Sequence, residues 1–116
     1  MIMIEGVQAK GHEISRKRLV FMWKAISDEP FPKVKAFQVH ARDFKSLLRT
    51  QKCLDNEIRE VEEWGRLLSV KGTDACVFNA QQTQDADYII LVRSSPYHTL
   101  DEILEHELSH IAAGDL

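Results

Sequence analysis

The sequence predicts an α+β fold, because two kinds of hydrophobic spacing alternate along one chain of 116 residues. Some segments place apolar residues three or four positions apart, as one face of a helix does, whereas others show the alternation or short β-branched runs of strands. Proline, glycine and polar clusters separate these segments. We therefore expect an antiparallel or mixed sheet of about three strands that packs against helices.

The composition fits one domain that covers residues 1–116. Hydrophobic residues make up 44% of the chain and charged residues 28%, which argues against disorder. The net charge of −3 gives no electrostatic reason to expect a nucleic-acid partner, so we interpret the basic cluster Arg16–Arg18 as the solvated face of a helix. No apolar run is long enough to cross a bilayer, and two cysteines make no disulfide framework. We expect a cytoplasmic protein without a membrane partner.

The first half of the chain is predicted to hold three helices and a strand. Apolar positions recur at helical spacing over Glu13–Ile26, before a pair of prolines, and alternate over Val34–Ala41, as in a strand. Asp43 is expected to cap a short helix over Phe44–Arg49, and a longer amphipathic helix is expected over Leu54–Leu68.

The second half is predicted to form a hairpin and a final helix. The strands are Ala75–Ala80 and Asp87–Arg93, which flank a polar loop and should pair in an antiparallel hairpin. The final helix is predicted over Leu100–Ala113. Thr99 and the glutamate three positions later fit a capping box, and Gly114 is the expected C-terminal stop.

The final helix carries the segment HELSH, which has the spacing of a zinc site. His106 and His110 are four residues apart, so both imidazoles lie on one face and can reach one ion at about 2.0–2.1 Å. Glu107 falls among the apolar positions, where a carboxylate is costly unless it is paired or faces a polar cleft. The pattern predicts Zn²⁺ ligands at both histidines and a general base at Glu107 that acts on a zinc-activated water. The alternative is an amphipathic helix whose histidines bind no metal.

The stretch from Cys76 to Ile111 resembles the core of the zincin metallopeptidases, particularly the small single-domain gluzincins. In that group, the edge strand of a hairpin leads by a short loop into the helix that carries HExxH. The segment DYIILVRSSPYHTLDEILEHELSHI follows this layout. The resemblance implies a small zincin-like domain with the HExxH helix at its C-terminus, and it implies the same zinc ligands, His106 and His110, with Glu107 as the catalytic base.

The resemblance also implies a way of binding substrate. An extended peptide would add to the edge strand of the sheet through main-chain hydrogen bonds. That role falls on the strand with Tyr88, Ile90 and Val92 as substrate-binding residues.

The third zinc ligand departs from the family pattern. Gluzincins take it, usually a glutamate, from a downstream helix, and the other large zincin group places Gly three and His or Asp six residues after the second histidine. Those positions hold Ala113 and Leu116 here. Asp115 is the candidate, because a turn at Gly114 would bring its carboxylate back towards the metal. The alternatives are His40, Cys76, His98, a second copy of the chain, or a third-ligand helix beyond Leu116 in a longer parent chain.

Two functions follow from this pattern. The first is a zinc-dependent metallopeptidase that hydrolyses a peptide or protein substrate. The second is a catalytically inactive zincin-fold module that binds a protein or forms a homodimer. The presence of Glu107 favours the enzyme, since a structural metal site needs no general base, whereas the missing third ligand favours the module.

Overall fold

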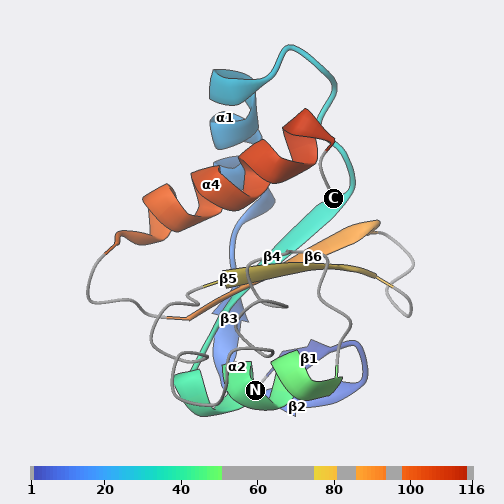
Figure 1. Ribbon diagram of the computed structural model, residues 1–116, viewed down its shortest axis with the longest axis vertical. Helices are drawn as coiled ribbons and strands as arrows, with labels where there is room; N and C mark the ends of the chain where they lie inside the picture. The colour runs from blue at the N-terminus through green and yellow to red at the C-terminus, as the bar shows by residue number, and fades with distance from the viewer. Residues whose placement is uncertain (1, 51–74, 81–85, 94–97, 115–116) are drawn as a thin grey trace, which may run out of the picture.

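The structure is a computed structural model that describes residues 2–50, 75–80, 86–93 and 98–114. Within these residues the chain is an α+β domain with three helices, a four-stranded mixed sheet and a separate hairpin (Figure 1). The elements are β1 (Ile2–Ile4), β2 (Val7–Ala9), β3 (Gly11–Glu13), α1 (Arg16–Ile26), β4 (Val34–Val39), α2 (Ala41–Thr50), β5 (Ala75–Asn79), β6 (Tyr88–Arg93) and α4 (Leu100–Ala113). The helix predicted over Leu54–Leu68 lies outside the described residues. So does Asp115.

The main sheet has the strand order β3-β4-β6-β5. Its outer pairs, β3 with β4 and β5 with β6, are antiparallel, and its central pair, β4 with β6, is parallel. The predicted hairpin of β5 and β6 is therefore confirmed, with Ala75 opposite Val92. The expected sheet of about three strands gains a fourth, β3, on the far side of β4.

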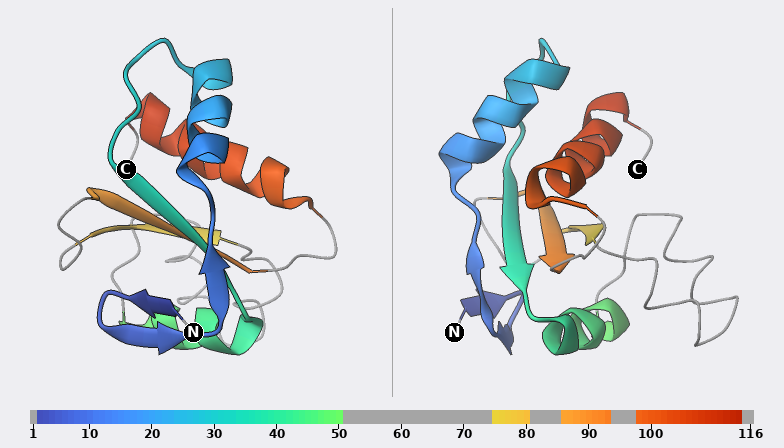
Figure 2. Two further views of the ribbon diagram at one scale, coloured as in Figure 1. Left: turned by 180° about the vertical axis from the view of Figure 1, so that it is seen from behind. Right: turned by 90° about the vertical axis from the view of Figure 1, so that its left-hand side faces the viewer.

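The sheet is covered on both faces, because successive residues of each strand point to opposite sides. Figure 2 shows α1 and α4 over one face, and α2 with the β1–β2 hairpin over the other. Strand residues beneath α1 and α4 are Val34, Ala36, Ala75, Val77, Ile90 and Val92. Those on the opposite face are Phe37, Val39, Cys76, Phe78, Ile89 and Leu91. Near-continuous apolar strands are thus explained by burial on both sides.

The N-terminal strands are absent from the sequence prediction. Glu5 and Gly6 both have positive φ, 49° and 81°, and join β1 to β2 as the two-residue turn that matches the twist of a hairpin. β3 then pairs with β4, so that Glu13 lies opposite Phe37 in a strand and does not begin the helix. α1 starts at Arg16 because the Ser15 side chain accepts a hydrogen bond from the backbone N–H of Arg18 at 3.2 Å.

The α2 helix starts earlier than predicted, at Ala41. Asp43 lies inside the first turn and is not its cap. Its carboxylate accepts a hydrogen bond from the backbone N–H of Lys10 at 2.8 Å, which ties the helix to the segment between β2 and β3. Among the residues described, no helix is long and apolar enough to cross a membrane.

Candidate metal centre

The α4 helix presents the HELSH segment, and both of its ends are fixed as the sequence predicts. The Thr99 hydroxyl accepts a hydrogen bond from the backbone N–H of Glu102 at 3.2 Å. At the other end, Gly114 has φ 69° and its N–H donates to the carbonyl groups of His110 and Ile111. These two caps set where the helix begins and ends.

One face of α4 packs on the sheet, where Ile103, Leu104 and Leu108 are buried against β5 and β6. One flank of the helix carries Asp101, whose carboxylate pairs with Arg18 of α1, at 2.9 Å from the Arg18 Nε. At about 100° per residue, His110 lies about 180° around the helix axis from Asp101, and His106 about 140°. The histidines therefore lie on the flank of α4 that faces away from α1.

The two imidazoles converge. The Nε2 atoms of His106 and His110 are 3.1 Å apart, and the rings meet edge to face with their centroids 4.6 Å apart. Two nitrogens that bind one tetrahedral zinc ion at about 2.0–2.1 Å are themselves about 3.3 Å apart. The pair is thus within a few tenths of an ångström of the spacing that a shared ion needs. His106 is exposed and His110 half-buried, so an ion can reach them from solvent.

Glu107 is buried, with 3% of its surface exposed. It lies about 60° from His110 around the helix, on the side turned to the sheet. A charged carboxylate in that position costs free energy that a neutral side chain would not. The sequence prediction that Glu107 is on the packed side of the helix is confirmed.

The third ligand is not found among the described residues, where no group of three His, Cys, Asp or Glu side chains could hold a metal. Cys76 is buried on the opposite face of the sheet from α4. His98 lies at the helix start, with its Nδ1 3.3 Å from a Glu102 carboxylate oxygen. His40 follows β4 and lines a separate pocket. These three alternatives do not join the histidine pair, and Asp115 stays a prediction.

The predicted substrate strand is not an edge strand. β6 pairs with β4 on one side and β5 on the other, so its main-chain groups are already engaged in the sheet. Ile90 and Val92 are fully buried beneath α4, and Tyr88 is half-buried. The prediction that Tyr88, Ile90 and Val92 form a binding edge is therefore wrong. β6 pairs with β4, which is far from it in the sequence, and this pairing places β6 inside the sheet.

Among the strands that the structure describes, the one at that end of the sheet is β5. The backbone N–H of Ala80 donates to the carbonyl of Asp87 at 3.0 Å, so Ala80 belongs to a hydrogen-bonded pair with the β6 side. In an antiparallel ladder such pairs alternate, and the residues between them direct their N–H and C=O groups the other way. Ala75, Val77 and Asn79 therefore turn their main-chain groups to the outer edge. The amino-acid sequence does not distinguish this edge from β6, since both are short apolar strands.

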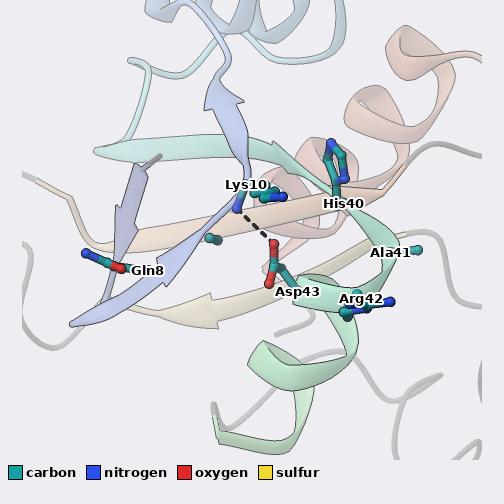
Figure 3. Close-up of a pocket in the computed structure, with 7 residues that line it drawn as sticks. Gln8, Lys10, His40, Ala41, Arg42 and Asp43 are labelled. Atoms are coloured by element: carbon teal, nitrogen blue, oxygen red, sulfur yellow. Dashed lines mark hydrogen bonds between the residues drawn. The ribbon is translucent and has the colours of Figure 1, made fainter.

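A pocket of about 580 Å³ lies away from the histidine pair, where the segment after β2 meets the start of α2. Figure 3 shows His40, Arg42 and Lys10 around it, with the Asp43 carboxylate bonded to the Lys10 backbone. The full lining is Gln8, Ala9, Lys10, His40, Ala41, Arg42 and Asp43. The lining side chains carry charges of both signs, and all three cationic or imidazole side chains are exposed.

Comparison with known proteins gives no family. No protein-family model matches the chain, and the searches of curated proteins and of solved structures found no significant match.

Proposed function

We propose that this protein is a zinc-dependent peptidase in which His106 and His110 hold the metal. The observation that carries the proposal is the convergence of the two Nε2 atoms to 3.1 Å on one flank of α4. A bound zinc ion supplies a water of lowered pKa and polarises the substrate carbonyl. The two histidines contribute the lone pairs of neutral imidazoles, which is the form that binds metal.

Glu107 acts as the general base in this proposal. Glu107 lies near the middle of α4, so the hydrogen bonds of the helix fix its backbone. Its burial holds the side chain in place beside the histidine flank. The carboxylate accepts a proton from the attacking water and passes it to the leaving amine. Asp115 is the proposed third ligand, supported by the left-handed conformation of Gly114, which ends the helix one residue before it.

The test is the metal content of the purified protein. The wild type is expected to hold about one zinc per chain, and His106→Ala/His110→Ala none, because both proposed imidazole ligands are removed. His12→Ala/His98→Ala is the matched control, since both histidines are exposed and neither joins the pair. A wild type that takes up no stoichiometric zinc, even after zinc is added back, contradicts the proposal. Equal zinc in wild type and double variant does so too.

A further inference from the structure

The outward faces of α1 and α4 carry opposite charges. Lys17, Phe21 and Lys24 lie within about 60° of arc on α1, pointing away from the buried Leu19 and Trp23, and all three are exposed. We call them the α1 stripe.

A matching set lies on α4. Glu102, Glu105 and Ser109 also lie within about 60° of arc, opposite the buried face of that helix, and all three are exposed. We call them the α4 stripe. Figure 2 shows that the two helices lie next to each other in one layer, so the two stripes are neighbours on one surface. The contact between α1 and α4 and the ion pair of Arg18 with Asp101 fix their relative position.

The α1 stripe has an apolar centre. Phe21 is 78% exposed, and among the described residues only Met3 is another exposed large apolar side chain. A phenyl ring so placed gains free energy when another surface removes it from water. The α4 stripe ends at Ser109, which lies next to the exposed Ala112, and these two small side chains leave room for such a ring.

From this arrangement we infer that the protein forms a two-fold homodimer through the layer of α1 and α4, with the α1 stripe of each copy on the α4 stripe of the other. A two-fold axis that lies in the interface, just outside this layer, and runs between the helices places α1 of one copy over α4 of its partner, and the reverse contact follows by symmetry. At each contact Lys17 then faces the glutamates of the partner, and Phe21, about one turn further along α1, packs on the small residues. The charge pattern is self-complementary, which is what an isologous interface requires.

The inferred interface leaves the candidate metal site accessible. His110 lies about 80° around the axis from Glu102, and His106 about 40°, on the side towards the sheet. The dimer therefore covers the outward face of α4 and not the flank between the helix and β5. The inference stands independently of zinc binding and of peptidase activity.

The test exchanges charges between the stripes and measures mass by sedimentation equilibrium. At tens of micromolar, the wild type should have twice the chain mass of 13.4 kDa. Lys17→Glu/Lys24→Glu places acid against acid, and Glu102→Lys/Glu105→Lys places base against base, so each variant alone should dissociate at least tenfold more readily. An equimolar mixture of the two should regain the dimer, because every contact between unlike variants pairs opposite charges.

Two controls separate this interface from other effects. Lys10→Glu/Lys33→Glu makes the same charge change on exposed lysines outside α1 and should stay dimeric. If circular dichroism shows that Glu102→Lys/Glu105→Lys does not fold, the single variant Glu105→Lys takes its place in the same measurement. A wild type that is still monomeric at about 100 micromolar, charge variants that stay dimeric, or a mixture that stays monomeric would each overturn the inference.

Discussion

Glu107 has a position that packing alone does not explain. It is buried on a helix face whose other buried residues are apolar, and an apolar residue of similar size would avoid the desolvation of a carboxylate. Its neighbours His106 and His110 converge on the adjoining flank. A general base must be held within reach of the reacting water, and this position beside the two proposed ligands fits that role.

Substitution of Glu107 separates metal binding from chemistry. Glu107→Gln keeps the size and hydrogen-bonding capacity of the side chain but cannot accept the proton, so hydrolysis should fall by about 10²–10⁴-fold. Zinc content should stay at the wild-type value, because the residue is not a ligand. The measurement is peptide cleavage by the zinc-loaded protein, alongside metal analysis. Cleavage at the wild-type rate would remove Glu107 from the proposed mechanism.

Gly11 is required by the close approach of two strands. A Cβ atom built at this residue would lie 2.0 Å from the carbonyl oxygen of Gln38, which is backbone and cannot rotate aside. Gly11→Ala should therefore push β3 from β4 and lower the free energy of unfolding by about 1–3 kcal/mol, the usual cost of overpacking. Urea unfolding followed by circular dichroism measures this change. Wild-type stability of the variant would show that the strands separate at no cost.

At the level of elements, the sequence predicts best where the signal is local. The limits of α4 are confirmed at both ends because Thr99 and Gly114 act through hydrogen bonds to residues within the same turn. The β1–β2 hairpin and β3 were missed because strands of three residues are too short to show alternation. They also depend on partners, since β3 is held by β4 rather than by its own sequence.

In the candidate site, too, the features set by local sequence were predicted and those set by strand pairing were not. The shared flank of His106 and His110 and the burial of Glu107 follow from helical periodicity, which a single sequence reveals. The position of a strand within the sheet does not follow from periodicity. β5 and β6 have similar composition, and only the tertiary pairing of β6 with β4 makes β5 the outer of the two. Sequence periodicity carries no information about which strand pairs with which.

For the whole molecule, zinc should act as a stabilising ligand. Ligand that binds only the folded state adds about 2.7 kcal/mol at a hundredfold excess over its dissociation constant. For a domain of this size, that corresponds to a rise of about 10 °C in the unfolding temperature. A thermal scan with and without zinc should show this rise in the wild type and in His12→Ala/His98→Ala. It should be absent from His106→Ala/His110→Ala, and a rise of equal size there would place the bound zinc elsewhere.

The parallel pairing of β4 with β6 determines the order in which the chain can fold. β3, α1 and β4 leave the ribosome first, but one side of β4 has no neighbour until β6 has been synthesised. β6 must then enter between β4 and β5, and its burial on both faces is completed only when α4 has followed it. Contacts between segments so far apart in sequence slow folding, because the loop between them must close before they are made. We therefore expect the nascent chain to acquire its core late, in a single step that includes the last helix.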